Sequence, residues 1–221
     1  SILSASNEMN GDLNTFSIDF SQIKSNDVDY PTMIYDGPFS DSVVNKKIVG
    51  LSGTELGREE VETMVKEVFK DLSKCQYTGE TNGNFDTYNF KVETSDMQNL
   101  FVQATKIGGH ILTVSGQNLS DAKTVDMKAG EKIALEFAKN NGVENAEVVW
   151  QEELNNQAYF NIAPKQDGVI LYPDLVKVKV DLEYGNVIGY DAISYWTNHK
   201  TRDLASAGDV SVSIPSGFTV K

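Results

Sequence analysis

The chain has 221 residues, of which 40% are hydrophobic and 10% aromatic, so it can build one large domain or two to three small ones. Its formal net charge of −13 argues against a nucleic-acid ligand, because phosphates bind surfaces rich in lysine and arginine. The same charge opposes direct adsorption to anionic lipid but is compatible with a basic protein partner or a cationic ligand. The single cysteine, Cys75, excludes an intrachain disulfide and a cysteine-based metal cage.

The sequence has no run of 18 or more apolar residues and no basic segment followed by a short apolar stretch. These are the patterns of a membrane-spanning helix and of an export signal. We therefore expect any membrane anchor or export signal to lie outside these 221 residues.

The segment TELGREEVETMVKEVFKDL, which starts at Thr54, predicts an amphipathic helix. Its apolar residues recur at intervals of three and four: Val61, Met64, Val65, Val68, Phe69 and Leu72. Ser52 and Glu55 have the spacing of a capping box before the helix. Cys75 follows the segment, at the expected C-terminal end of the helix, where the helix dipole raises the pKa of a thiol.

The segment DMKAGEKIALEFAKNNG, which starts at Asp126, predicts a second helix of the same kind. Ala129, Ile133, Ala134 and Phe137 fall on one face. The pair Asn141-Gly142 predicts a left-handed C-terminal cap.

Each predicted helix is followed by segments with the period of β-strands and by turn pairs that join them. The predicted turns are Asn82-Gly83, Gly108-Gly109, Asn155-Asn156 and Gly185-Asn186. In VKVKVDLEY, alternation predicts that Val176, Val178, Val180 and Leu182 face the core. It predicts equally that Lys177, Lys179 and Asp181 face water.

The pattern as a whole predicts an α+β fold made of tandem repeats, each with one helix packed on a four-stranded antiparallel meander sheet. The final hairpins of the two copies align, with Val102 on Val178 and Gly109 on Gly185. The expected boundaries are 54–119 for the first repeat and 120–199 for the second. We expect residues 1–53 to form an N-terminal brace or partial module, and residues 200–221 to form a linker and the start of a third module that can be truncated.

No motif indicates catalysis, a metal or a cofactor. His110 and His199 are isolated and match no zinc-binding spacing, so we expect His110 at a hairpin tip and His199 in a surface or hydrogen-bonding role. The sequence contains no nucleophile elbow and no phosphate-binding glycine loop. The carboxylate pairs Glu59-Glu60 and Glu152-Glu153 have structural explanations, at a helix start and before a hairpin turn.

Aromatic side chains concentrate in two segments, YPTMIYDGPFSD and GYDAISYWTNH. They are Tyr30, Tyr35, Phe39, Tyr190, Tyr195 and Trp196, and His199 closes the second segment. These residues fill a core or the space between modules, or alternatively form an interaction patch, because Tyr and Trp often anchor interfaces. Asp191 is expected to brace the turn after the last strand.

The helix-plus-meander unit resembles a PepSY domain. The segments YPTMIYDGPFSD, GYDAISYWTNH and GEKIALEFAKNNG together resemble the YpeB family of spore-germination proteins, over the stretch from Tyr30 to Phe218. Members of that family carry an N-terminal membrane segment followed by repeated PepSY modules, and they depend mutually on the cortex-lytic enzyme SleB.

The resemblance implies a non-catalytic protein of the spore, outside the inner membrane, that binds and stabilises, localises or restrains a SleB-type peptidoglycan hydrolase. Two alternatives stay open. PepSY units also resemble segments beside secreted metalloproteases, which would make the chain a protease inhibitor or a propeptide-like module. A cell-wall hydrolase that works through carboxylates is the third hypothesis.

Overall fold

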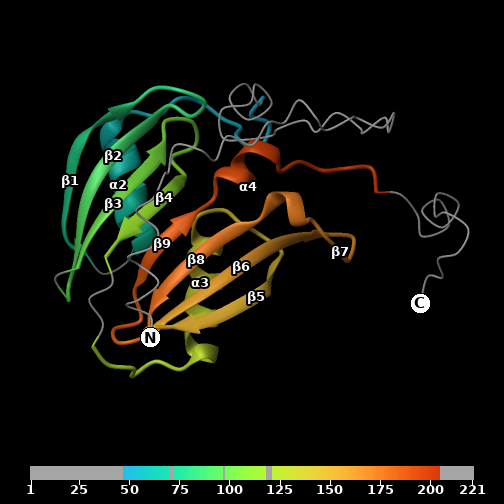
Figure 1. Ribbon diagram of the computed structural model, residues 1–221. Coiled ribbons are helices and arrows are strands. Elements are labelled where there is room, and N and C mark those ends of the chain that lie inside the picture. The colour runs from blue at the N-terminus through green and yellow to red at the C-terminus, as the bar shows by residue number, and fades with distance from the viewer. Residues whose placement is uncertain (1–46, 70–71, 97, 118–120, 205–221) are drawn as a thin grey trace, which may run out of the picture. The chain divides into compact units, whose positions relative to one another are not determined.

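The computed structural model describes residues 47–69, 72–96, 98–117 and 121–204. All of them lie in one compact unit, Asp41–Lys221. The fold is α+β, as predicted, with few helices and one large antiparallel sheet (Figure 1).

Two successive segments of the chain have the same order of elements, one helix followed by strands. The first half consists of α2 (Arg58–Phe69), β1 (Leu72–Thr81), β2 (Thr87–Thr94), β3 (Asn99–Thr105) and β4 (Ile111–Gly116). The second half consists of α3 (Met127–Asn140), β5 (Ala146–Leu154), β6 (Gln157–Gln166), β7 (Val169–Ile170), β8 (Val176–Asp181) and β9 (Val187–Asp191). A 3₁₀ turn (Tyr172–Asp174) precedes β8, and the short helix α4 (Ile193–Asn198) follows β9.

The strands of both halves belong to one continuous sheet, in the order β1-β2-β3-β4-β9-β8-β6-β5, with β7 paired to the end of β6. The halves join where β4 pairs with β9, with Val114 opposite Tyr190 and Ser115 opposite Gly189. We call this pair of strands the seam. Within its own half, each of β4 and β9 is an edge strand with unpaired backbone N–H and C=O groups. Pairing β4 with β9 satisfies these groups, which would otherwise need water.

Helix α2 is shorter than predicted, because the residues before it are extended. The Leu56 amide donates to the Lys106 carbonyl (2.9 Å), and Glu55 forms an isolated bridge with Ile107. The predicted capping box of Ser52 and Glu55 is therefore wrong. Instead Glu60 accepts a hydrogen bond from the Gly57 amide (2.8 Å), which satisfies a donor at the helix start.

Cys75 also lies elsewhere than predicted. It is a residue of β1, paired with Val92, and not the end of a helix. Leu72, predicted on the helix, starts the same strand. The sequence pattern of the helix runs into that of the strand without a break, so periodicity alone did not locate the boundary.

Helix α3 begins and ends as predicted. The side chain of Asp126 accepts a hydrogen bond from the Ala129 amide (2.7 Å), and Gly142 adopts a left-handed φ of 87° after the last turn. Ala134, Phe137 and Ala138 are buried along one face.

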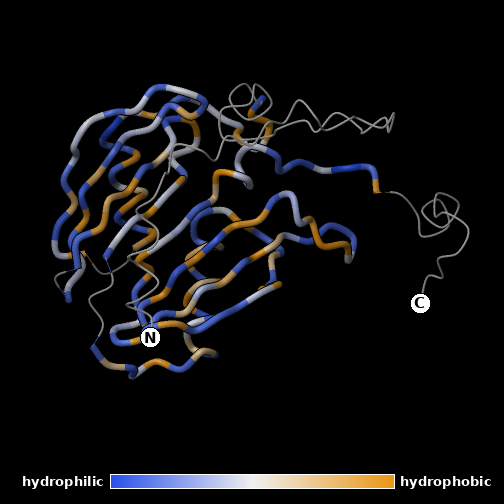
Figure 2. The backbone as a smooth tube through the Cα atoms, in the orientation of Figure 1, coloured by the Kyte–Doolittle hydropathy of each residue, from blue (hydrophilic) through white to orange (hydrophobic). Residues whose placement is uncertain are grey.

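All four predicted turns join antiparallel strands. Asn155 and Asn156 have φ of 51° and 57°, and Gly108, Gly109 and Gly185 also have positive φ, a conformation that glycine and asparagine adopt at the least cost. Hydrophobic and hydrophilic residues alternate along the strands (Figure 2).

The predicted inward set Val176, Val178, Val180 and Leu182 is buried. Asp181, predicted to face water, is fully buried instead. Gln98, from the connection between β2 and β3, donates to Asp181 Oδ2, and the Glu183 amide donates to Asp181 Oδ1 (2.8 Å). The first half therefore covers a position that alternation within β8 assigns to the surface.

Both helices pack on one face of the sheet, α2 against β1 to β3 and α3 chiefly against β8, β6 and β5 (Figure 1). The core between the helices and the sheet contains Val61 and Val65 of α2, Phe90 of β2 and Phe160 of β6. The opposite face, which we call the open face, carries two unbroken rows of cross-strand neighbours that span all eight main strands.

The residues of the first row pair in sequence across the sheet. They are Gly79, Asn89, Gln103, Thr113, Asp191, Lys177, Asn161 and Trp150. The second row lies two residues from the first along each strand, and three residues along β1, where a bulge intervenes. It contains Gln76, Lys91, Phe101, Ser115, Gly189, Lys179, Tyr159 and Glu152. Of these residues only Asn89 is buried. We call the two rows together the open-face strip.

Candidate functional site

Five of the eight residues predicted at a site lie on β9 and α4 or just after them. Tyr190 and Asp191 end β9, Tyr195 and Trp196 are buried in α4, and His199 is the C-terminal cap of that helix. Tyr30, Tyr35 and Phe39 lie outside the described residues. The Asp191 carboxylate accepts a hydrogen bond from the Ile193 amide (3.0 Å), so it braces the start of α4.

Tyr190 is held in the interior by Asn141. The amide of Asn141 donates to the Tyr190 hydroxyl (2.9 Å) and to the Ile111 carbonyl (2.8 Å), and its oxygen accepts from the Ile111 amide (2.7 Å). One side chain thus links the end of α3 to β4 and β9, the two strands of the seam. Burial raises the pKa of Tyr190, so its hydroxyl stays protonated and acts as a structural hydrogen-bonding group. The sequence pattern predicts Asn141 only as part of a helix cap.

The aromatic residues of α4 tie three segments of the chain together. Tyr195 donates to the Gly142 carbonyl (3.3 Å), and burial is the main cause that raises the pKa of Tyr195 to about 12. Trp196 stacks on His110, with ring centroids 3.9 Å apart. Gly50 donates its amide to the Trp196 carbonyl (3.0 Å), and a Cβ at this glycine would lie only 2.5 Å from that oxygen. The close approach therefore requires glycine.

His110 follows the Gly108-Gly109 turn, as predicted, but it is half-buried by its contact with Trp196. Burial lowers the pKa of His110, and a hydrogen bond with the backbone of Asn141 acts in the opposite direction. The imidazole of His110 therefore serves mainly to pack against Trp196, and it can still take up a proton at low pH.

His199 belongs to a cluster around the buried Asp174 that the sequence pattern does not predict. Asp174, which is 0% exposed, accepts two hydrogen bonds from the Arg202 guanidinium (2.7 and 2.6 Å), and His199 Nδ1 lies 2.9 Å from Asp174 Oδ2. The hydrogen bond to Asp174 is the main cause that raises the pKa of Arg202. Because both carboxylate oxygens are engaged, the cluster holds the chain after α4 against the 3₁₀ turn. No local motif marks Asp174 in the sequence.

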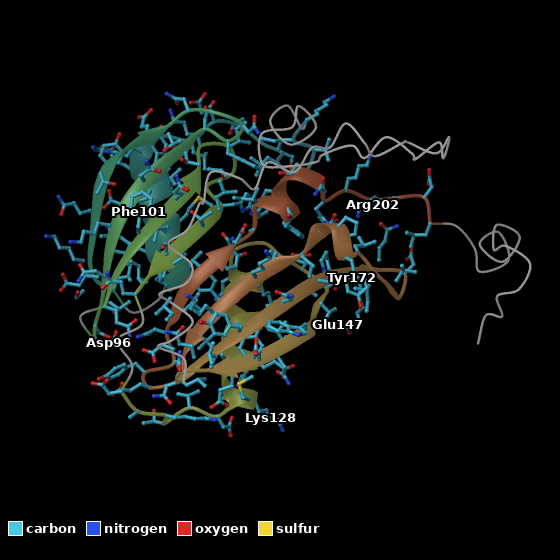
Figure 3. All side chains as sticks on the ribbon, in the orientation of Figure 1. Asp96, Phe101, Lys128, Glu147, Tyr172 and Arg202 are labelled. Atoms are coloured by element: carbon cyan, nitrogen blue, oxygen red, sulfur yellow. The ribbon has the colours of Figure 1, made fainter. Side chains whose placement is uncertain are left out.

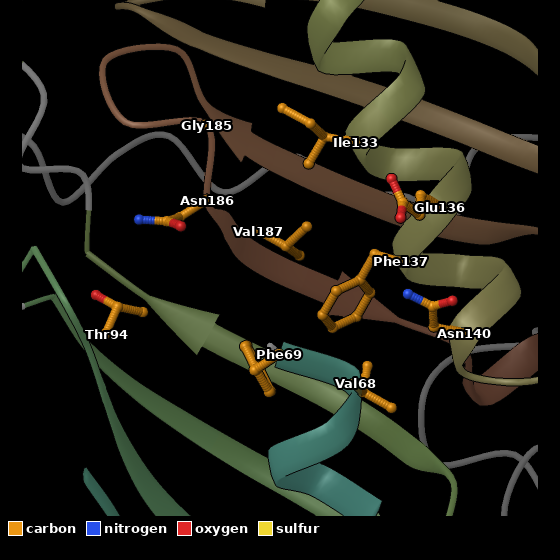
Figure 4. A pocket seen from close by; sticks show the side chains of 10 residues that line it. All are labelled: Val68, Phe69, Thr94, Ile133, Glu136, Phe137, Asn140, Gly185, Asn186 and Val187. Atoms are coloured by element: carbon orange, nitrogen blue, oxygen red, sulfur yellow. The ribbon is translucent and has the colours of Figure 1, made fainter. Parts of the chain in front are cut away.

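A hollow of the helix-covered face lies between α2 and α3, above the seam (Figure 4). Its volume is about 160 Å³. Half of the residues that line it are apolar, and they come from both helices and from β9: Val68, Phe69, Ile133, Phe137 and Val187. The rings of Phe69 and Phe137 pack edge to face, with their centroids 5.3 Å apart, so the two halves are in direct contact at the hollow.

A second hollow, of about 340 Å³, shares Val68 and Asn140 with the first and continues toward Met64, Gly109 and His110. We call the two together the interhelical trough. The titratable residues that line it are Glu136 in the first hollow and Glu67 and His110 in the second. The trough therefore combines apolar side chains with polar ones and has three titratable groups in its lining, which suits the binding of a side chain of a partner.

The cysteine and the carboxylate pair of β5 do not form a reactive site. Burial raises the pKa of the half-buried Cys75 thiol to about 11, so little thiolate forms at neutral pH. Glu152 and Glu153 are exposed on β5, where Glu153 pairs with Lys123 (2.6 Å). Within the described ranges, no group of three or more His, Cys, Asp and Glu residues is placed to hold a metal ion. The helices of the described part are all too short or too polar to cross a membrane.

The helices packed on one large antiparallel sheet define an α+β protein. A family model described as YpeB sporulation, PepSY1 and PepSY2 domains matches residues 16–205, and the chain therefore belongs to the YpeB family of sporulation proteins. This family consists of sporulation proteins with PepSY domains and not of known enzymes.

Individual relatives agree with this assignment. The chain is 29% identical over 126 residues to the sporulation protein YpeB of Halalkalibacterium halodurans. The matched segment covers 57% of this chain and 28% of that protein. The chain is 26% identical over 161 residues to the sporulation protein YpeB of Bacillus subtilis, with coverage of 70% and 35%. The chain thus spans about a third of the length of these relatives. The Bacillus megaterium YpeB C-terminal domain has the same fold, with a TM-score of 0.63, 21% identity, and coverage of 76% of this chain and 79% of that one.

Proposed function

We propose that this chain acts in spore germination as a binding partner of a SleB-type cortex-lytic hydrolase, which it stabilises, localises or restrains. Family membership supports a role in sporulation and germination. The observation that carries the binding role is the interhelical trough, which presents Val68, Phe69, Ile133 and Phe137 between two helices, with few titratable groups at its edge. An apolar side chain of the hydrolase, seated in this trough, would anchor the complex.

Binding of the chain to the purified hydrolase tests this proposal. We expect a saturable interaction by calorimetry, weakened about tenfold by Val68→Ser, which corresponds to roughly 1.4 kcal/mol. Leu135→Ser is the matched control, because Leu135 is also a partly buried helical residue packed on the core but lines a different hollow on α3. Absence of binding by the unaltered chain, or equal binding by both variants, would refute the role of the trough.

We further propose that the two halves are tandem PepSY units, with boundaries at 54–119 and 120–199, flanked by a brace (1–53) and by a linker that begins a third unit (200–221). The repeated order of one helix and antiparallel strands supports this division, as does a matching family model whose description includes two PepSY domains. An experimental structure in which α2 with β1–β4 superposes on α3 with β5, β6, β8 and β9, strand for strand, tests it. Superposition with strands out of register would contradict it.

The proposed place of action is the spore, outside its inner membrane, with attachment through a segment outside the 221 residues. The sporulation family supports the first part of this proposal. Fractionation of spores with an antibody against the chain tests it. Recovery of the protein in the spore core fraction would exclude this location.

A further inference from the structure

The open-face strip is long and carries mostly polar residues. It crosses eight strands, which corresponds to roughly 34 Å at a strand spacing of about 4.8 Å. The helices cover the other face of the sheet, and Phe101 stands on the strands of the first half (Figure 3). Such a surface fits an extended ligand that lies across the strands.

The strip differs in charge from the chain as a whole. It contains Lys91, Lys177 and Lys179, none of which has an ion pair within the described residues, together with Asp191 and Glu152. Three positive and two negative side chains give a formal charge of +1, in a chain of −13. This local excess favours an anionic ligand, but it is too small for a nucleic acid, which needs many phosphate contacts.

Amide and hydroxyl groups in the strip are held in fixed orientations. Thr113 donates to the Gln103 oxygen (2.9 Å), Gln103 donates to the Asn89 oxygen (3.4 Å), and Asn89 donates to the hydroxyl of Thr81 (2.9 Å). Each of the two amides uses one of its two N–H groups in this series of hydrogen bonds, and the second N–H of the partly exposed Gln103 remains available. The side-chain amide of Asn161 makes no hydrogen bond within the described part of the chain.

Aromatic rings accompany these polar groups. Phe101 is 44% exposed and Trp150 is 46% exposed, and the Lys179 ammonium lies 5.5 Å above the ring of Tyr159. The strip is lower at Gly189, which has no side chain, and a hollow lies over strands β1 to β4. A Cβ at Gly189 would come within 2.9 Å of Lys179, and Phe101, Lys91 and Ser115 line an open hollow of about 510 Å³.

We propose that the open-face strip binds an elongated polysaccharide that carries carboxylates. Amides and hydroxyls match the hydroxyl and N-acetyl groups of sugars, exposed rings match the C–H faces of sugar rings, and unpaired lysines match carboxylates. This inference goes beyond the proposed function, because it places the chain in direct contact with a glycan polymer on the face opposite the interhelical trough.

Fluorescence anisotropy with the whole 221-residue chain and labelled, peptide-free peptidoglycan glycan strands tests the proposal. These strands are N-acetylated, and every second sugar bears a carboxylate. We expect the glycan strands to bind saturably. An uncharged N-acetylglucosamine hexamer and poly-L-glutamate should both bind more weakly than the strands. No binding to the glycan strands, equal binding of the uncharged hexamer, or equal binding of poly-L-glutamate would overturn it.

Variants locate the surface. Lys177→Gln with Lys179→Gln should weaken binding about 5- to 30-fold, since two charge-assisted contacts are lost. Lys128→Gln with Lys132→Gln makes the same change of charge on the exposed side of α3 and should leave binding unchanged. If both double variants weaken binding equally while both retain the unaltered melting temperature, long-range charge and not the strip is responsible. That result would refute the site.

Discussion

Asn141 provides the sharpest test of how the two halves are held together. Its side chain links the end of α3 to the Ile111 backbone of β4 and to the Tyr190 hydroxyl of β9. In Asn141→Ala, one backbone N–H, one backbone C=O and one hydroxyl lose that partner in a buried site. Asn141 has φ of −90°, so alanine fits the backbone and the effect should come from the lost hydrogen bonds.

Each buried polar group left unpaired costs about 1–3 kcal/mol. Rotation of the Tyr190 hydroxyl and entry of water into the vacated space recover part of this loss, so we expect Asn141→Ala to lower the free energy of unfolding by about 3 kcal/mol. Urea denaturation followed by far-UV circular dichroism and by tryptophan fluorescence measures it, and coincident curves justify a two-state fit.

Tyr190→Phe is the matched comparison. It removes only the hydroxyl, while the Asn141 amide keeps its bonds to Ile111, so the expected loss is about 1 kcal/mol. If Asn141→Ala costs less than about 1 kcal/mol, or no more than Tyr190→Phe, the central role of Asn141 at the seam is refuted.

Three further predictions concern titratable groups. With a pKa of about 11, the Cys75 thiol should react with iodoacetamide roughly two orders of magnitude more slowly than a free cysteine of pKa about 8.5 at pH 7.5, and equal rates would contradict its burial. Asp174→Asn should cost about 3 kcal/mol of unfolding free energy, because it leaves the Arg202 guanidinium without its carboxylate. In a double-mutant cycle with Arg202→Met the losses should be less than additive, and strict additivity would show that the pair is not coupled. Burial lowers the pKa of His110 in the folded state, so the unfolded chain binds more protons below about pH 6.5, and stability should fall as the pH decreases through that range. His110→Phe keeps a ring against Trp196 and should remove this part of the pH dependence, whereas an unchanged profile would assign it to other groups.

The two proposed binding sites lie on opposite faces of the sheet. The interhelical trough lies on the helix-covered face, and the open-face strip lies on the other, so Val68→Ser and the Lys177 and Lys179 substitutions probe different surfaces. A chain that binds the hydrolase through one face and a glycan through the other would place the enzyme next to its polymer. Loss of one interaction without the other in the respective variants distinguishes the proposals.

Local sequence patterns predicted the elements of this fold well. The alternation of Val176, Val178 and Val180 and the turn residues Asn155, Asn156 and Gly185 predicted strands and hairpins that the structure contains. These predictions succeed because side-chain periodicity and left-handed backbone conformations are properties of a few neighbouring residues.

Local sequence patterns do not predict contacts between residues that lie far apart in the sequence. Asp181 is buried because Gln98 from the other half covers it, and Asp174 is satisfied by Arg202, 28 residues further along the chain. The pairing of β4 with β9 depends in the same way on two strand edges that no local pattern matches to each other. Which polar residues are buried, and which surfaces remain for a partner, is set by the long-range packing of the two halves, since burial is a property of the assembled chain and not of any short segment.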